Sequence, residues 1–205
     1  MSTVAIIDYG MGNLDSVARA VEECGAHPMV AERASALAEA DRIILPGVGA
    51  FGDGMRELAA RSFDQALRDE VLGNGIPLLG ICLGMQLLAD TGFEGGETPG
   101  LGFIAGEVVR LEPDTPGTRI PHVGWNEVEA SRPCALFEGV ASGTDFYFVH
   151  SYHFRCADSA DAAACTPYCG GFVSCVHRGP VFGVQFHPEK SQKPGLRLLS
   201  NFLAL

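Results

Sequence analysis

The sequence predicts a doubly wound α/β fold whose sheet is mostly parallel, with an antiparallel section added in the C-terminal half. In residues 1–90, short apolar runs alternate with stretches of helical periodicity, as in buried parallel strands joined by helices. Beyond residue 100, strand-like stretches follow one another without helices between them. The 205 residues are 47% hydrophobic and 19% charged, which provides enough apolar material for a real core, and we expect a single domain over residues 1–205.

The same patterns place the individual elements. Parallel strands are expected at residues 4–7, 28–30, 42–45 and 77–81, because these runs are short and apolar. Helices are expected at residues 14–24, 35–40, 55–72, 83–89 and 194–205, with Ser35 as a cap and glycines after two of them. Antiparallel strands are expected within residues 101–111, 119–129, 145–155 and 171–186, with a loop at 157–171.

Charge and cysteine usage exclude several classes of protein. The net charge is −11, and no basic stripe occurs, so we expect no nucleic-acid partner. The apolar stretches are shorter than the ~20 residues of a membrane span, and Met1-Ser2-Thr3 is unlike the basic start of a signal peptide, so we expect a cytoplasmic protein without membrane contact. The seven cysteines lack paired spacing, which favours reduced structural thiols over disulfides or a metal site. No metal or cofactor is expected.

One cysteine stands in a pattern that favours chemistry. Gly80-Ile81-Cys82-Leu83-Gly84 lies where a buried strand is expected to pass into a helix, and it is the cysteine version of the nucleophile elbow G-x-S-x-G. A residue on such a sharp turn adopts a strained backbone, and the two glycines let neighbouring chain pass close by. The start of the following helix would favour the thiolate. The alternative is that Cys82 is a structural thiol at the end of a strand.

A second pattern supplies a base for this thiol. In Val184-Gln185-Phe186-His187-Pro188-Glu189, His187 and Glu189 are two residues apart, so in an extended chain their side chains share a face. Pro188 favours the extended conformation at His187. A histidine oriented by a carboxylate is the general base that a cysteine nucleophile needs. The alternative is an ordinary buried histidine.

A glycine-rich turn supplies the third part. Pro46-Gly47-Val48-Gly49 follows a predicted parallel strand, so it lies at the carboxyl edge of the sheet, where ligands bind in open α/β folds. Backbone N–H groups at Val48 and Gly49, together with that of Leu83, would form an oxyanion hole. The alternative is an ordinary tight turn.

These three segments resemble the class I (triad) glutamine amidotransferases, in which P-G-x-G, G-x-C-x-G-M-Q and F-H-P-E occur in this order. The resemblance covers essentially the whole chain. It extends to one branch of the family, the glutaminase subunits of histidine biosynthesis, and Pro121-His122-Val123-Gly124-Trp125-Asn126 is the discriminating stretch. The other similar stretches are residues 7–14, 46–51, 82–86 and 186–191.

The resemblance implies a role for each site residue. Cys82 would attack the carboxamide of glutamine and form a γ-glutamyl thioester, while His187 moves the proton and Glu189 orients His187. The residues implied to bind glutamine are Gly47, Gln86, Glu94, His150, Ser151 and Tyr152. Glu94 would bind the amino group. For residues 150–152, a polar cluster at the end of a strand is the alternative.

The resemblance also implies a partner. Glutaminases of this branch dock on a (β/α)8-barrel cyclase subunit, which receives the ammonia through a covered exit. The residues that align near that interface are Asn13, His122, Trp125 and Lys190. Tryptophan is a favoured interface anchor, and Lys190 is one of only two lysines in the chain.

Three other functions stay open on the sequence alone. They are a stand-alone cysteine hydrolase on the same flavodoxin-like core, the glutaminase subunit of another biosynthetic pathway, and a non-catalytic interaction module. A stand-alone hydrolase would turn over its substrate at full rate without a partner. For an interaction module, Cys82→Ala would leave the biological role intact.

Overall fold

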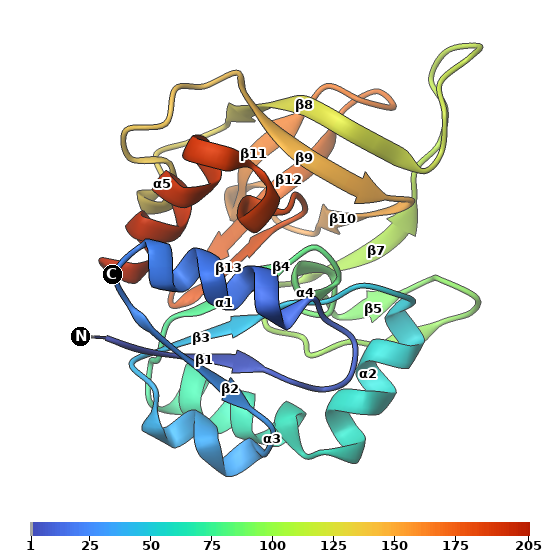
Figure 1. The fold of residues 1–205 in the computed structure, drawn as a ribbon. Helices are drawn as coiled ribbons and strands as arrows, with labels where there is room; N and C mark the ends of the chain where they lie inside the picture. Colours follow the sequence, from blue (N-terminus) through green and yellow to red (C-terminus); the bar gives the residue numbers. More distant parts are fainter. Residues whose placement is uncertain (1) are drawn as a thin grey trace.

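The computed structural model describes residues 2–205 and confirms the α/β fold class (Figure 1). The parallel strands are β1 (Thr3–Ile7), β2 (His27–Ala31), β3 (Arg42–Leu45), β4 (Leu78–Ile81) and β13 (Val181–Val184). The helices are α1 (Leu14–Glu23), α2 (Phe51–Ala60), α3 (Phe63–Leu67), α4 (Leu83–Gln86) and α5 (Gln192–Leu203). The other strands are β5 (Thr91–Gly92), β6 (Thr98–Pro99), β7 (Gly106–Arg110), β8 (His122–Ala130), β9 (Thr144–His150), β10 (Tyr152–Cys156), β11 (Ala162–Thr166) and β12 (Phe172–Arg178). The short helical segments are η1 (Ala34–Glu39), η2 (Arg68–Gly73), η3 (Ala135–Phe137), η4 (Ser159–Asp161) and η5 (Pro188–Lys190).

Within residues 2–205 the strands form one 13-stranded sheet, whose main path is β2-β1-β3-β4-β13-β12-β10-β7-β5-β6. Its first five strands are parallel and follow the 2-1-3-4-5 order of one class of doubly wound folds, with β13 as the fifth. β11, β8 and β9 continue from β12 as an antiparallel extension, which is uppermost in Figure 1. The carboxyl ends of β4 and β13 therefore meet at one edge of the sheet.

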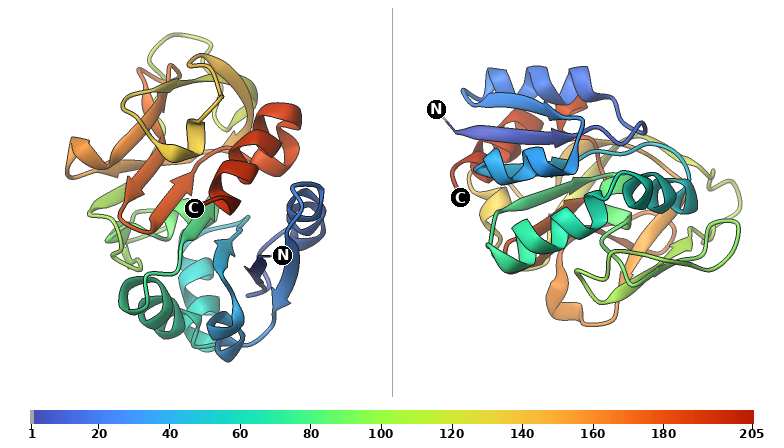
Figure 2. Two further views of the ribbon diagram at one scale, coloured as in Figure 1. Left: turned by 90° about the vertical axis from the view of Figure 1, so that its left-hand side faces the viewer. Right: turned by 90° about the horizontal axis from the view of Figure 1, so that it is seen from below.

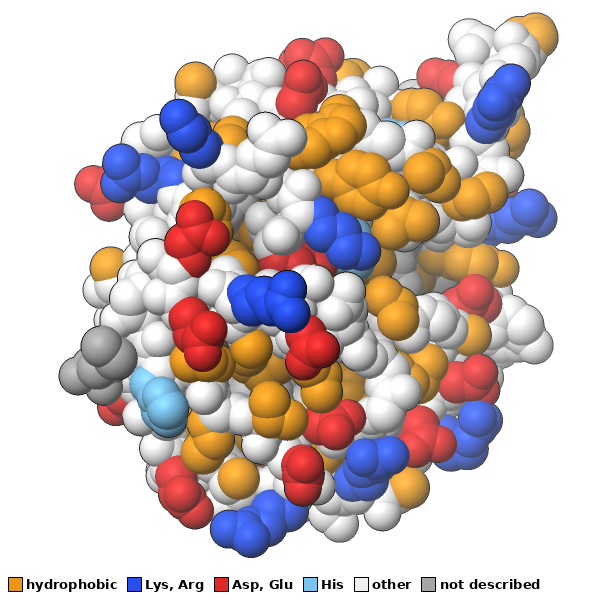
Figure 3. Space-filling model, viewed as in Figure 1, with side chains coloured by type: hydrophobic (Ala, Val, Ile, Leu, Met, Phe, Trp, Pro, Cys, Tyr) orange, Lys and Arg blue, Asp and Glu red, His pale blue; other side chains and the backbone are white. Residues whose placement is uncertain are grey.

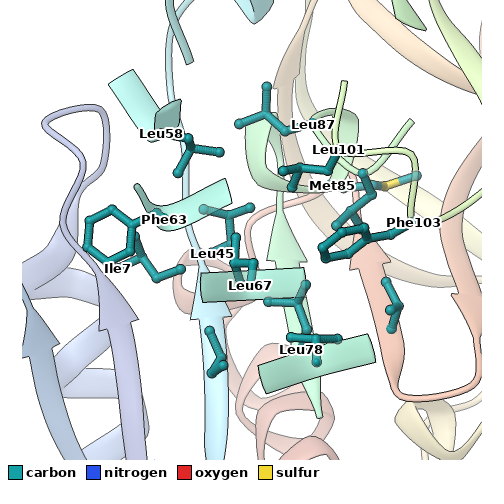
Figure 4. Close-up of a cluster of buried hydrophobic side chains, with 14 of the residues drawn as sticks. Ile7, Leu45, Leu58, Phe63, Leu67, Leu78, Met85, Leu87, Leu101 and Phe103 are labelled. Atoms are coloured by element: carbon teal, nitrogen blue, oxygen red, sulfur yellow. The ribbon is translucent and has the colours of Figure 1, made fainter. Parts of the chain in front are cut away.

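Helices cover both faces of the parallel half, which explains why its strands are apolar throughout. α1 and α5 pack on one face and bury Val21 and Phe202 there. η1, α2 and α3 cover the other face, where Phe63 and Leu67 pack against the strands (Figures 2 and 4). Each such buried side chain contributes about 1.5–3 kcal/mol through removal of apolar surface from water. None of the helices within residues 2–205 is both long enough and apolar enough to cross a bilayer.

The predicted helices are wrong in part. The helix expected at residues 55–72 begins at Phe51 and is interrupted at Ser62, whose φ is 59°, before α3 and the π-helical η2 continue. The apolar stripe runs across this interruption, so periodicity did not reveal it. α4 ends at Gln86, earlier than expected, and Arg33 rather than Ser35 occupies the N-cap of η1.

The antiparallel half contains more strands than predicted. Residues 157–171, expected to form a loop, hold η4 and β11, and β11 pairs with both β12 and β8. The run Ala162-Ala163-Ala164 has low intrinsic β propensity, so pairing on both edges determines its conformation. The strand expected at 145–155 is divided at Ser151 into β9 and β10. The antiparallel strand expected at 171–186 is divided by a turn at Gly179 into β12 and β13, and β13 pairs in parallel with β4, contrary to the prediction.

Candidate active site

Cys82 stands between β4 and α4 with a strained backbone. Its φ is 54° and its ψ is −109°, a conformation that a non-glycine residue rarely adopts. A Cβ on Gly80 would lie 2.7 Å from the backbone of Gly84, and a Cβ on Gly84 would collide with the carbonyl oxygen of Leu45. These contacts confirm the sharp turn and the close chain approach predicted from the two glycines. α4 is a single turn, so the support for a thiolate expected from its dipole is small.

The pairing of β4 with β13 brings the distant halves of the site together. The strands are parallel, and Ile81 lies opposite Val184, so the residues that follow each strand meet at the same edge of the sheet. The backbone N–H of Cys82 donates to the carbonyl oxygen of Val184 at 2.8 Å. His187 follows three residues later, which places the imidazole beside the thiol.

His187 is buried and bonded to Glu189. The Nδ1 atom of His187 lies 2.8 Å from Oε1 of Glu189, and the two side chains are 4% and 2% exposed. Burial by itself lowers the pKa of His187, but Cys82 and Glu189 beside it raise this pKa to about 9. The Nε2 atom of His187 is buried and makes no hydrogen bond of standard geometry to any residue in 2–205. It is the nitrogen available for the thiol proton.

Glu189 reaches His187 by a different route from the one predicted. His187 itself is extended, with φ −101° and ψ 95°, as Pro188 favours. Glu189 lies within the 3₁₀ turn η5 and returns to the imidazole through that turn, so the two side chains do not share the face of a strand. The backbone of His187 is fixed by hydrogen bonds from its N–H to Tyr147 O at 2.9 Å and from Ser191 Oγ to its carbonyl at 2.6 Å.

Two of the three predicted oxyanion donors, the N–H groups of Val48 and Leu83, are engaged within the protein in this structure. The N–H of Val48 donates to Met11 O at 2.8 Å, and the N–H of Leu83 donates to Gly47 O at 3.3 Å. Both donors are therefore occupied by backbone carbonyls. The Gly47 carbonyl and the Val48 N–H belong to one peptide group, so the orientation of that peptide decides both bonds. Gly49 has a φ of 117°, a region that glycine adopts without strain.

A pocket of about 300 Å³ opens beside the thiol, at the lower end of the size range of small-molecule sites. Its lining consists of Val48, Gly49, Cys82, Leu83, Gln86, Glu94, Pro121, Val149, His150, Ser151 and Tyr152. All the residues predicted to bind glutamine line this pocket except Gly47. A Cβ on Gly47 would collide with the Tyr9 hydroxyl, so close packing under the loop explains the glycine.

Gln86 and Glu94, two residues predicted to bind glutamine, each use one side-chain atom in hydrogen bonds within the protein. Gln86 Nε2 donates to Tyr152 O at 2.9 Å and to Gln185 Oε1 at 3.0 Å. Glu94 Oε2 accepts from the N–H of Phe51, the first residue of α2, at 2.8 Å. A ligand would therefore meet the amide oxygen of Gln86 and the second carboxylate oxygen of Glu94.

Sequence reasoning missed two buried polar residues beside the thiol. Gln185 Nε2 lies 3.7 Å from Cys82 Sγ. The hydroxyl of Tyr9 donates to Pro46 O at 2.9 Å, and burial together with Cys82 raises the pKa of Tyr9. The available signal was a glutamine inside the apolar run of residues 184–186, because a buried amide requires partners.

An exposed apolar patch covers β8 and β9 near the pocket (Figure 3). Trp125 is 48% exposed, and Val123 and Val149 are also exposed. Trp125 packs edge-on against Tyr147, with ring centroids 6.1 Å apart. Neighbouring exposed apolar side chains that include a tryptophan are typical of an interaction surface.

The other residues predicted to meet a partner differ in exposure. Asn13 and Lys190 are exposed, and Asn13 also caps α1 by accepting from the N–H of Ser16 at 3.4 Å. His122 is only 4% exposed, so its ring lies beneath the surface rather than on it. The two-residue period of β8 turns His122 inward and Trp125 outward.

The fold and the site define a class of protein. The family model described as glutamine amidotransferase class-I matches residues 5–205, and the chain belongs to this family. One solved structure, described as glutamine amidotransferase, supports the fold with a TM-score of 0.77 at 20% identity, covering 98% of this chain and 99% of that chain.

Two relatives of higher sequence identity are both HisH subunits. The imidazole glycerol phosphate synthase subunit HisH 1 of Campylobacter jejuni (strain RM1221) is 47% identical over 202 residues, covering 98% of this chain and 100% of that protein. The imidazole glycerol phosphate synthase subunit HisH of Moorella thermoacetica is 48% identical over 202 residues, covering 98% of this chain and 94% of that protein.

Proposed function

We propose that this chain is the glutaminase subunit of an imidazole glycerol phosphate synthase. It hydrolyses glutamine to glutamate and ammonia and passes the ammonia to a (β/α)8-barrel cyclase subunit, which makes imidazole glycerol phosphate and aminoimidazole carboxamide ribotide. The observation that carries the proposal is the buried His187–Glu189 pair beside the strained Cys82, in a chain whose relatives at 47% and 48% identity are HisH subunits. We place the protein in the cytoplasm and treat it as one domain, because a single sheet runs through it.

The reaction follows from the three side chains. Nε2 of His187 takes the thiol proton, and Sγ of Cys82 attacks the carboxamide carbon of glutamine. The tetrahedral intermediate collapses to a γ-glutamyl thioester as the imidazolium returns the proton to departing ammonia. A water molecule, deprotonated by His187, then releases glutamate. Glu189 keeps the proton on Nδ1 and stabilises the imidazolium, which accords with the raised pKa of about 9.

In the resting structure, two donors of the oxyanion hole, the N–H groups of Val48 and Leu83, are occupied by backbone carbonyls. We place the formation of the hole at the peptide between Gly47 and Val48. Its rotation would break the bonds to Met11 and Leu83 and free both N–H groups for the oxyanion. Two backbone hydrogen bonds contribute about 1–3 kcal/mol together, which differential binding of a partner or ligand to the rotated loop can offset.

The cyclase partner docks over the apolar patch on β8 and β9, with Trp125 as its anchor and with Asn13 and Lys190 contributing polar contacts. A covered exit is needed because ammonia released into water would be protonated before it reached a second active site. The patch lies beside the pocket that holds Cys82, since Val149 belongs to both.

Labelling with a diazo-ketone glutamine analogue tests the nucleophile. We expect modification of Cys82 alone, prevented by glutamine, while the other six cysteines serve as internal controls. Cys134 is the most stringent of these controls, because a hydrogen bond with the Cys175 thiol lowers its pKa to about 7, which favours the reactive thiolate. Labelling spread over several cysteines would contradict the assignment.

A second measurement separates a subunit from a stand-alone hydrolase. The chain is assayed for glutamine hydrolysis alone and after assembly with the barrel cyclase, with and without the ribulosyl nucleotide substrate. We expect little hydrolysis without the partner and ammonia transfer in the complex. Full activity of the isolated chain would favour the hydrolase, and activity coupled to a different acceptor subunit would favour another pathway.

A further inference from the structure

Gln185 has no part in the steps above, although it is fully buried beside the nucleophile. It is the first residue after β13, and its backbone N–H donates to Ser174 O at 2.9 Å. Its side-chain Nε2 lies 3.7 Å from Cys82 Sγ, and its Oε1 accepts from Gln86 Nε2 at 3.0 Å. The Gln185 amide therefore bridges a residue of the pocket lining and the sulfur.

A backbone carbonyl determines which way the two amides point. Gln86 Nε2 donates to Tyr152 O at 2.9 Å, and a carbonyl oxygen can only accept. A reversed Gln86 amide would set its oxygen against that of Tyr152, so its NH₂ group faces Tyr152 and, with its second hydrogen, Gln185 Oε1. Gln185 is then left with an N–H directed at the sulfur.

The same argument assigns the donors and acceptors of two buried histidines, His150 and His122. His150 Nδ1 donates to Tyr152 O at 2.8 Å, so His150 Nε2 accepts from His122 Nδ1 at 3.0 Å. His122 Nε2 in turn accepts from Asn126 Nδ2 at 3.2 Å. Both histidines are neutral in this arrangement, and burial accordingly lowers the pKa of His122 to about 4 and that of His150 to about 3. One assignment of donors and acceptors satisfies the whole network from Asn126 to Cys82.

We propose that Gln185 is a positioning residue for the nucleophile: its side-chain N–H, aimed by Gln86, holds the sulfur of Cys82 and stabilises the thiolate. The inference rests on the proposed function only in taking Cys82 as the nucleophile. The carbonyl oxygen of Val149, 3.9 Å from Sγ, can accept from the neutral thiol but offers nothing to the anion. The Gln185 N–H donates to the anion, and such charge-assisted bonds are the stronger kind.

The test is the pH dependence of Cys82 alkylation by iodoacetamide, followed by peptide mass spectrometry, in Gln185→Met and Gln185→Glu. Both variants keep the length of the side chain, but the first removes the donor and the second places a carboxylate oxygen against the sulfur. Tyr9 and His187 are the titratable groups beside the sulfur, and both are unchanged in these variants. The control is Ser174→Ala, which removes a fully buried hydroxyl that makes no hydrogen bond within residues 2–205.

We expect the alkylation profile of Gln185→Met to move upward by about one pH unit and that of Gln185→Glu to move further, because a hydrogen bond to an anion is lost. In the assembled complex, kcat falls by about tenfold while KM stays within about twofold. Ser174→Ala follows the wild type in both assays. Wild-type alkylation profiles in both folded Gln185 variants would overturn the proposal. Alkylation needs no glutamine turnover, so this outcome is distinct from failure of the proposed function.

A measurement on the unaltered chain applies even where a variant does not fold. In protein labelled with ¹⁵N-glutamine, the side-chain amide signal of Gln185 is assigned and followed before and after alkylation of Cys82. We expect this signal to shift because its hydrogen-bond acceptor has changed. An unshifted signal after complete alkylation would overturn the proposal.

Discussion

Glu189→Gln tests the physical centre of the site, which is the buried negative charge beside His187. Glutamine keeps the shape of the side chain and can still present an oxygen to Nδ1 of His187, but it removes the charge. The carboxylate is 2% exposed and lies 2.8 Å from the imidazole, so solvent screens the interaction only weakly.

The size of the effect follows from the titration of His187. Burial opposes protonation, yet Cys82 and Glu189 raise the pKa of His187 from 6.5 to about 9. A net change of that size corresponds to about 3 kcal/mol in favour of the imidazolium. Cys82 and Glu189 together contribute more than this, because they also offset the effect of burial. We expect Glu189→Gln to lower this pKa by about one unit or more and to reduce kcat by about tenfold to a hundredfold, because the thiolate–imidazolium pair is depleted.

The same change predicts a pH dependence of stability. Because folding raises the pKa of His187, the associated stabilisation is complete below about pH 6.5 and is lost as the pH rises through about 9. The contribution of Glu189 to the free energy of unfolding, measured as the difference between wild type and variant, should therefore decline between these two pH values. Denaturant unfolding at pH 6 and pH 9 measures this difference.

The decisive assay is the NMR titration of the His187 imidazole, together with glutamine hydrolysis in the assembled complex. Glu23→Gln is the matched control, because Glu23 is an exposed carboxylate of α1 that lines the same surface cleft as Glu189. We expect the control to titrate and react like the wild type. If His187 in Glu189→Gln titrated at the wild-type pH, the electrostatic account of the triad would be refuted.

Three further predictions concern the surface, the turn and the buried histidines. Trp125→Ala should weaken partner binding by about tenfold or more, whereas Leu72→Ala, on an equally exposed side chain of η2, should leave the dissociation constant unchanged; equal effects would refute the proposed anchor. Gly84→Ala should lower the free energy of unfolding by about 3 kcal/mol, since its Cβ meets the backbone of β3; Gly73→Ala, which has room for a Cβ, should change it by less than about 1 kcal/mol. The free energy of unfolding of the wild type should fall as the pH drops from 6.5 toward 4, because His150 takes up a proton in the unfolded chain but, when buried, accepts one only near pH 3. In His150→Gln, denaturant titrations should show a weaker fall, with the proton uptake on unfolding reduced by about one.

Local patterns in the sequence determined four of the five parallel strands and the expected triad. The fifth, β13, was predicted as part of an antiparallel strand, although it pairs in parallel with β4. β1, β3 and β4 were predicted to within about a residue, because a strand covered on both faces is apolar at nearly every position and can be recognised without its neighbours. The turn at Cys82 was predictable because Gly80 and Gly84 are required where chain passes against chain. Pro188 likewise fixed the extended backbone of His187 through its own ring.

Contacts between distant segments decided the rest. β11 is a strand because β8 and β12 pair with its two edges, although its alanines favour no such conformation. Met11 lies far from Val48 in the sequence, yet its carbonyl oxygen accepts from the Val48 N–H, which was predicted to be an oxyanion donor. Gln185 lies beside Cys82 because β13 pairs with β4, and this pairing is not visible in the sequence. A hydrogen-bond partner or a buried face depends on which segments pack together, and that is a property of the whole folded chain.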